Sequence, residues 1–229
     1  MFLRRRLAQA EYLDSPRRSA SELRTAYAAL ARVNRLCQFS HPFVSVLPRW
    51  LGVADCQSLQ ILDVGAGDGL LGRRLVPWAN RRGWRWQCTN LDMNSCALSL
   101  DDGARRVLGT ALALPFCDRS FDLVIASQMT HHFHHDEEVI QHFREAWRVT
   151  RDAVLFSDLH RNAAFYAALW GLVRLLRVPA ETRSDALMSV RGGFRVGEWR
   201  TLAAAAGLND ARVWVYAGAR IMLQARKSR

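Results

Sequence analysis

The stretch "ILDVGAGDGLLGRRL", residues 61–75, decides the fold of this chain. It places an apolar run, three glycines at alternate positions and a helical pattern in direct succession, which predicts a strand, a tight turn and a helix. Glycine at positions 65, 67 and 69 lets a backbone turn sharply and approach a ligand closely. Because ligands of open α/β sheets bind at the carboxyl ends of strands, the turn is a predicted cofactor site.

Outward from this stretch, short apolar runs alternate with helical patterns, which indicates right-handed crossovers and a parallel sheet. A helix over 197–208, ended by Gly207, precedes two further runs that only three residues separate, so these two strands have to pair antiparallel. The prediction is a Rossmann-like, mostly parallel seven-stranded α/β sheet with a C-terminal antiparallel hairpin. The seven predicted strands lie at residues 60–65, 84–92, 106–111, 121–127, 153–159, 210–216 and 220–226.

The first 55 residues carry no strand pattern and predict a helical cap. Ser19-x-x-Glu22 is a capping box, and apolar residues follow it at helical spacing. These residues are Leu23, Tyr27, Leu30, Val33 and Leu36. The domain division is therefore a cap over 1–55 and a main domain over 56–229, with a helical insertion at about 162–190.

Composition narrows the class of protein. The 229 residues include no apolar run long enough to span a bilayer and no signal peptide pattern, so we expect a cytoplasmic protein. The formal charge of +11 suggests an anionic partner, yet Lys227 is the only lysine beside 31 arginines, a bias that coding composition also produces. Nucleic acid is therefore not a favoured partner. Five scattered cysteines without a Cys-x-x-Cys pair argue against a disulfide framework and a structural zinc site.

The carboxylates around the glycines restrict the ligand. Gly67-x-Gly69-x-x-Gly72 also fits the dinucleotide pattern, so spacing alone leaves NAD or FAD open. Asp63, within the strand, and Asp68 would repel a diphosphate. Asp92 ends the next strand, where a carboxylate accepts hydrogen bonds from ribose hydroxyls. A ligand with a ribose and a positive ammonium group, but no phosphate, fits these residues.

The segments "LDVGAGDG", "LD" and "GTALALPFCDRSFDLVIAS" together resemble the class I, seven-strand S-adenosylmethionine-dependent methyltransferases, from about Leu59 to the end of the chain. The resemblance implies S-adenosyl-L-methionine as cofactor, with its methionine part on the glycine turn, its ribose at Asp92 and its adenine beside Met93. Where the family carries an acidic residue near the adenine, this chain has Thr110, so adenine selection would depend on backbone groups. The implied cofactor residues are Asp63, Gly65, Ala66, Gly67, Asp68, Gly69, Asp92, Met93, Thr110, Ala111, Leu112 and Ser127.

The residues after the fourth strand indicate the acceptor. Family members that methylate amino groups of DNA bases, and some that act on RNA or protein, have Asn or Asp followed by Pro-Pro-aromatic there. This chain has "SQMTHHF" instead, beginning at Ser127, the last residue of the strand. The resemblance then favours a small hydrophobic acceptor of phenol, resorcinol or quinone-precursor type, methylated on oxygen or carbon. His132 and His131 are the candidate catalytic bases, since imidazole titrates near neutral pH. A packing role for either ring is an equal alternative.

The neighbouring polar residues have simpler interpretations. His134 and His135 precede three acidic residues, a pattern typical of the start of a helix. The four histidines of this loop and Asp136 are so closely spaced that they cannot all bind one metal ion, so no metal is predicted. Asp158 could orient or deprotonate an acceptor, or could instead hold Arg161 or cap the next helix.

The apolar segment 162–178 could line an acceptor cavity through Phe165, Tyr166, Trp170 and Leu172, or pack against the N-terminal helix. The same segment carries Arg174 and Arg177, three residues apart, and a second basic group comprises Arg4 to Arg6, Arg17 and Arg18. Apolar surface with arginines suits peripheral contact with an anionic membrane, although a solvated face explains the charges as well. RNA methylation and a non-catalytic cofactor-binding module are the alternative functions.

Overall fold

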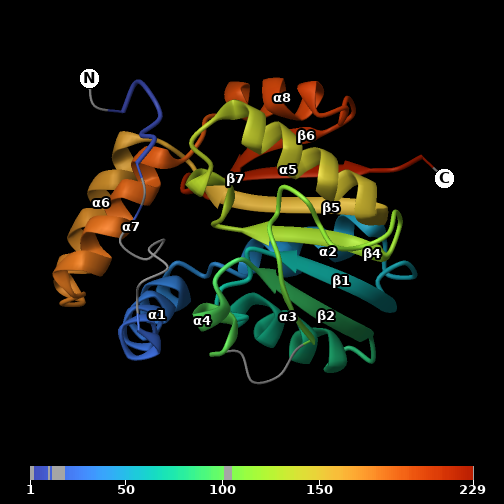
Figure 1. Cartoon of the computed structure of the whole chain (residues 1–229), viewed down its shortest axis with the longest axis horizontal. Coiled ribbons are helices and arrows are strands. Elements are labelled where there is room, and N and C mark those ends of the chain that lie inside the picture. The colour runs from blue at the N-terminus through green and yellow to red at the C-terminus, as the bar shows by residue number, and fades with distance from the viewer. Residues whose placement is uncertain (1–2, 10, 12–18, 101–104, 229) are drawn as a thin grey trace.

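The computed structural model describes residues 3–9, 11, 19–100 and 105–228, and a seven-stranded sheet runs through it in the order β3-β2-β1-β4-β5-β7-β6 (Figure 1). The first five strands are parallel, while β7 pairs antiparallel with both β5 and β6. The predicted sheet and its hairpin are confirmed. The strands are β1 (Ser58–Val64), β2 (Arg85–Asp92), β3 (Arg105–Leu108), β4 (Phe121–Ser127), β5 (Thr150–Leu159), β6 (Arg212–Tyr216) and β7 (Arg220–Arg226).

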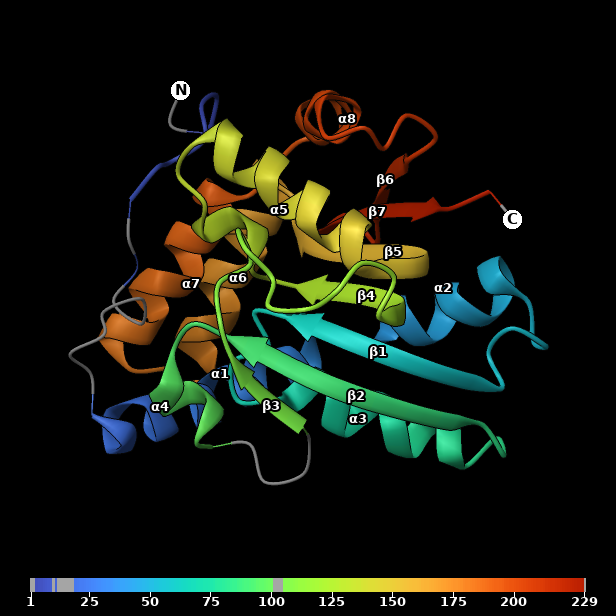
Figure 2. The ribbon, with the colours of Figure 1, turned by 45° about the vertical axis from the view of Figure 1, so that its right-hand side comes forward.

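Helices cover both faces of the sheet and its carboxyl edge (Figure 2). On one face lie α5 (Asp136–Val149) and α8 (Val196–Ala205), and on the other lie α2 (His41–Leu51) and α3 (Leu70–Asn80). Beyond the carboxyl ends of the parallel strands lie α1 (Ala20–Leu36), α6 (Ala163–Leu175) and α7 (Ala180–Gly192). The short helices are α4 (Ser95–Leu98) and the 3₁₀ turn η2 (Thr130–His132). The carboxyl edge is therefore a site enclosed by helices.

The predicted capping box forms at the start of α1. The Ser19 N–H donates to Glu22 Oε2 at 2.9 Å, and the Glu22 N–H donates to Ser19 Oγ at 3.3 Å. The buried stripe of α1 is shorter than predicted, because Leu36 is 57% exposed. The helix turns its last residues away from the core.

The helical insertion packs on α1. Leu169 and Val173 of α6 join Ala29 and Val33 of α1 in one apolar cluster, which supports the packing interpretation of this segment. Trp170 is exposed, and the Arg174 guanidinium lies 3.6 Å from the centroid of its ring. Of the two predicted basic groups, Arg17 and Arg18 lie outside the described residues. No helix in the described part of the chain has the length and hydropathy needed to cross a bilayer.

His142 gives the fold a specific pH dependence. It is fully buried on α5, with ring centroids 5.1 to 5.6 Å from those of Phe133, Phe143 and Phe156, and burial lowers its pKa to about 4. An unfolded histidine has a pKa near 6.5, so between these two values only the unfolded chain takes up the proton. The free energy of unfolding should therefore fall as the pH drops through this window, by about 2 to 3 kcal/mol at pH 4.5.

His142→Leu should remove that dependence. Urea unfolding of both proteins at pH 7 and pH 4.5 measures it: the difference in unfolding free energy between variant and parent should shift in favour of the variant at the lower pH. An equal pH slope in both proteins would show that His142 is not the group responsible.

Candidate active site

The glycine turn after β1 has the geometry that its sequence predicts. Gly65, Gly67 and Gly69 have φ angles of 69°, 57° and 73°, in the left-handed region that other residues adopt at a cost. The N–H groups of Gly65 and Ala66 both donate to the Leu91 carbonyl, at 2.8 and 3.0 Å. The turn is thus tied to the end of β2, and Gly69 is the N-cap of α3.

Two side chains from distant segments close on this turn. A Cβ at Gly65 would lie 2.1 Å from Cγ of Met129, and one at Gly67 would lie 3.2 Å from Cε1 of Tyr27. Sequence reasoning missed both: Tyr27 stood only in the apolar stripe of α1, and nothing local marked Met129. A ligand on the glycines has to contact these side chains or displace them.

Asp92 holds the turn from the neighbouring strand. Its Oδ2 accepts from the Gly67 N–H at 2.7 Å and its Oδ1 from the Asn94 N–H at 2.8 Å. Burial raises the pKa of Asp92, against the smaller lowering effects of these N–H groups and of His132. Each carboxylate oxygen keeps a further lone pair for a hydroxyl group. Asp63, only 1% exposed, lies beneath the same edge of the sheet.

The remaining predicted cofactor residues occupy different surroundings. Asp68 pairs with Arg73 at 2.9 Å, and its Oδ1 accepts from the Leu70 N–H at 3.2 Å, so this carboxylate caps α3. Met93 and Thr110 are exposed beyond β2 and β3. The Leu112 N–H donates to Thr110 Oγ1 at 3.2 Å. Because the Leu112 N–H is engaged in this way, the Ala111 N–H is the backbone group that we expect to serve an adenine.

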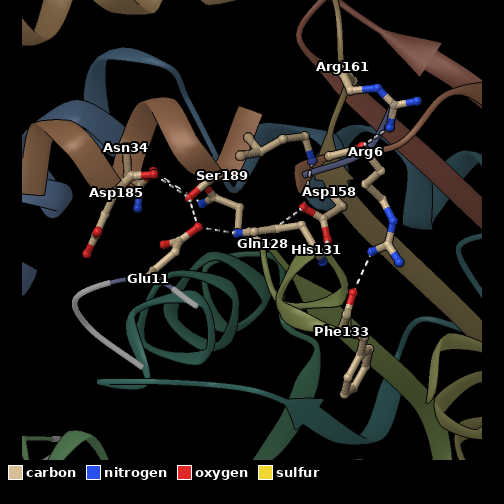
Figure 3. Close-up of polar contacts among 12 residues, drawn as sticks. Arg6, Glu11, Asn34, Gln128, His131, Phe133, Asp158, Arg161, Asp185 and Ser189 are labelled. Atoms are coloured by element: carbon tan, nitrogen blue, oxygen red, sulfur yellow. Dashed lines mark hydrogen bonds and ion pairs between the residues drawn. The ribbon is translucent and has the colours of Figure 1, made fainter. Parts of the chain in front are cut away.

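His131 and Asp158 form a buried pair across the ends of β4 and β5 (Figure 3). His131 Nδ1 lies 2.6 Å from Asp158 Oδ1, and the His131 N–H donates to Asp158 Oδ2 at 2.9 Å. Burial alone would raise the pKa of Asp158, but His131 and these hydrogen bonds keep it below its usual value. Asp158 therefore orients His131.

The alternative pairing of Asp158 with Arg161 is wrong. Arg161 donates instead to the carbonyls of Leu3, at 3.2 Å, and Gly193, at 2.6 Å, and pairs with Glu198. This side chain is fully buried, and its guanidinium ties the N-terminal segment to α8.

Glu11 faces the other nitrogen of His131. Glu11 Oε1 lies 3.6 Å from His131 Nε2 and accepts a hydrogen bond from Ser189 of α7 (Figure 3). The His132 ring lies on the His131 ring, with centroids 4.3 Å apart. Ligand atoms of Glu11, His131 and His132 fall within 4.8 Å of one another, a set that could hold a divalent cation. An imidazole held between two carboxylates accounts for the same geometry, so the expected absence of a metal stays a prediction.

The second histidine pair is the entrance of α5, as predicted. The N–H groups of His134 and His135 each donate to Glu138 Oε2 at 3.0 Å.

On the opposite side of the loop, Gln128 Nε2 donates to Asn34 Oδ1 at 3.2 Å and joins the end of β4 to α1. The loop after β4 therefore has one wall from α1 and one from α7.

Comparisons with known proteins agree with this geometry. Residues 62–156 match the family described as a methyltransferase domain. Among solved structures, the plantazolicin methyltransferase BamL, with S-adenosylhomocysteine bound, has 12% identity and a TM-score of 0.62 over 92% of this chain and 96% of its own. A SAM-dependent methyltransferase from Aquifex aeolicus has 13% identity and a TM-score of 0.57 over 92% and 99%. Magnesium protoporphyrin IX methyltransferase from Synechocystis has 12% identity and a TM-score of 0.52 over 82% and 79%. No curated protein matches the chain.

Residues 62–156 are thus a methyltransferase domain, and the fold around them is that of the class I S-adenosylmethionine-dependent methyltransferases. This match agrees with the glycine turn and Asp92, from which the sequence predicts an S-adenosylmethionine-dependent methyltransferase. The residues of this edge fit the cofactor: a turn of left-handed glycines lies beside a carboxylate that can accept from ribose hydroxyls.

Proposed function

We propose that the chain methylates a small hydrophobic acceptor of the phenol, resorcinol or quinone-precursor type, on oxygen or on a ring carbon. The observation that carries the proposal is the pair of histidines after β4, one of them fixed by Asp158. They stand where the family resemblance implies a different motif in enzymes that methylate amino groups of DNA bases. Methylation of a phenol at either position is easier from the phenolate, and a phenol with a pKa near 10 needs a base at neutral pH.

In this proposal His132 is the base and His131 is a positioning residue. His131 is only 6% exposed, with a carboxylate facing each of its nitrogens, so its ring is poorly placed to meet an acceptor. His132 is half-buried, lies on the His131 ring and is within electrostatic reach of Asp92. It can therefore take the proton of a hydroxyl group near the cofactor end of the site.

The bound cofactor supplies an electrophilic methyl group on a sulfonium. The chain itself has to hold the acceptor in line with that methyl and keep water away. Gly65, Gly67 and Asp92 would bind the cofactor, and Tyr27 and Met129 would enclose it. Asp158 would hold His131, and so the His132 ring, in place.

An acceptor panel tests this function. Purified protein is mixed with S-adenosylmethionine and phenols, resorcinols, hydroquinones, aliphatic amines or RNA, and S-adenosylhomocysteine is measured by mass spectrometry. We expect turnover with the hydroxylated aromatic compounds alone. Turnover on RNA or amines alone would contradict the proposal. No turnover with any acceptor, together with tight S-adenosylhomocysteine binding, would favour the non-catalytic alternative.

RNA methylation is the second candidate, because one cavity is rich in arginine. The cavity, of about 390 Å³, lies between α1, α2 and α3, and its lining includes Arg35, Arg73, Arg74 and Arg81. If RNA is the acceptor, its affinity should fall steeply with salt concentration.

Peripheral membrane contact through the exposed side of α6 also stays a prediction.

A further inference from the structure

Arg220 is a buried arginine whose guanidinium is unsatisfied in hydrogen bonding among the described residues. It is the first residue of β7 and only 5% exposed. Within the described part of the chain, its side chain has no hydrogen bond or ion pair, and its Nη1 is enclosed. Burial lowers the pKa of Arg220, while the nearby Asp158 and Cys37 act in the opposite direction.

The other fully buried arginine shows how this chain otherwise satisfies a guanidinium. Arg161 donates to two backbone carbonyls and pairs with Glu198. A buried cation without such partners is costly, and native proteins rarely retain one without a reason. The difference between Arg161 and Arg220 therefore points to a partner for Arg220 that is not among the described residues.

Two buried hydroxyl groups lie on the same face of the sheet as Arg220. Ser127 and Ser157 are register partners at the ends of β4 and β5, and Arg220 pairs with Leu159, two residues beyond Ser157. Because side chains two apart in a strand share a face, the three residues face the same side. Oγ of Ser127 and Oγ of Ser157 are enclosed, with no hydrogen-bond partner in the described part of the structure.

These three groups belong to the acceptor side of the sheet edge. In the sheet order, β7 lies three strands from β1, which at a spacing of ~4.8 Å is about 14 Å from the glycine turn. Ser127 begins the loop that carries the histidines. Asp158 and Leu159 are consecutive in β5, so Asp158 and Arg220 lie on opposite faces of the sheet at this edge.

We propose that Arg220, together with the hydroxyl groups of Ser127 and Ser157, binds a carboxylate on the acceptor, so that the substrate class is a phenolic carboxylic acid. The inference rests on the proposed function. A guanidinium binds a carboxylate through two parallel hydrogen bonds, and serine hydroxyls add further donors. An acceptor lying across the edge would then present its hydroxyl group to His132 and its carboxylate to Arg220.

Matched acceptors and variants test the site. The acceptors are a dihydroxybenzoic acid and the corresponding resorcinol, which lacks the carboxylate. Arg220→Met should raise KM for the acid roughly 10- to 100-fold and leave KM for resorcinol unchanged. The control is Arg212→Met, which removes an exposed arginine from neighbouring β6. An unchanged KM for the acid would overturn the proposal.

Binding measurements test this inference independently of the proposed function. They also test whether Arg220 binds the carboxylate of the cofactor's amino-acid end instead of that of the acceptor. The dihydroxybenzoic acid alone should raise the melting temperature of the parent and of Arg212→Met, but not that of Arg220→Met. That result without any methyl transfer would leave the site standing and refute the function. A weaker S-adenosylhomocysteine affinity in Arg220→Met, with acid binding unchanged, would assign Arg220 to the cofactor and overturn the proposal. The melting temperature of Arg220→Met without ligand is the control for correct folding. We expect it to equal that of the parent, because the substitution removes an unpaired buried charge.

Discussion

His132→Ala is expected to lower turnover of a phenolic acceptor roughly 100- to 10,000-fold, the range that a general base contributes. The ring is half-buried beside His131 on the loop after β4, and it acts electrostatically on Asp92, the carboxylate proposed to hold the ribose. Binding of S-adenosylhomocysteine should be unchanged, because the glycine turn and Asp92 are untouched. Single-turnover formation of S-adenosylhomocysteine and calorimetric titration measure the two quantities.

His134→Ala is the matched control, since this histidine is on the same loop but belongs to the entrance of α5. Its turnover should equal that of the parent. His131→Ala should lower turnover less than His132→Ala, because it removes the support of the base rather than the base itself. Unchanged turnover in both His131→Ala and His132→Ala would refute the base role.

Asp92→Ala is expected to weaken S-adenosylhomocysteine binding about 100-fold or more, because hydrogen bonds to a charged acceptor contribute about 1.5 to 3 kcal/mol each. Two consequences add together. The ribose would lose its carboxylate, and the Gly67 N–H would lose the acceptor that now lies 2.7 Å away and fixes the turn. Calorimetric titration with S-adenosylhomocysteine measures the change directly.

Asp68→Ala provides the comparison within the same turn. Its carboxylate contacts Arg73 and the start of α3 rather than the glycines, so cofactor affinity should change far less than in Asp92→Ala. Equal losses in the two variants would show that the turn responds to any loss of charge, and the specific role of Asp92 would then be wrong.

The elements of the fold could be predicted closely where the signal is local. The runs at 121–127 and 220–226 match β4 and β7 residue for residue, and the Ser19 capping box starts α1 as expected. Alternation and capping depend on neighbours a few residues apart, so the sequence carries them directly. The prediction failed at Leu36, where helical periodicity continues but the surface that would bury the side chain has ended.

The candidate site could be predicted only in part. The sequence predicted that Asp92 and the glycines meet at the ends of two neighbouring strands, and the structure brings them together. Their contact with a cofactor stays a prediction. The sequence left the role of Asp158 open between an acceptor, Arg161 and the cap of the next helix. It gave no sign that Glu11, Tyr27 or Asn34 would reach this edge, because their contacts join segments about 40 to 120 residues apart.

The sequence by itself therefore determined the order of strands and helices, the glycine turn and the carboxylate beside it, because backbone freedom and hydrophobic period are local properties. Only the tertiary structure decided that Asp158 meets His131 and that α1 closes on the turn through Tyr27. It also decided that Arg220 is buried without a hydrogen-bond partner among the described residues. The first depends on the neighbouring positions of β4 and β5, and the last on the insertion of β7 between β5 and β6. That insertion brings the start of a C-terminal strand to the edge where the acceptor would bind.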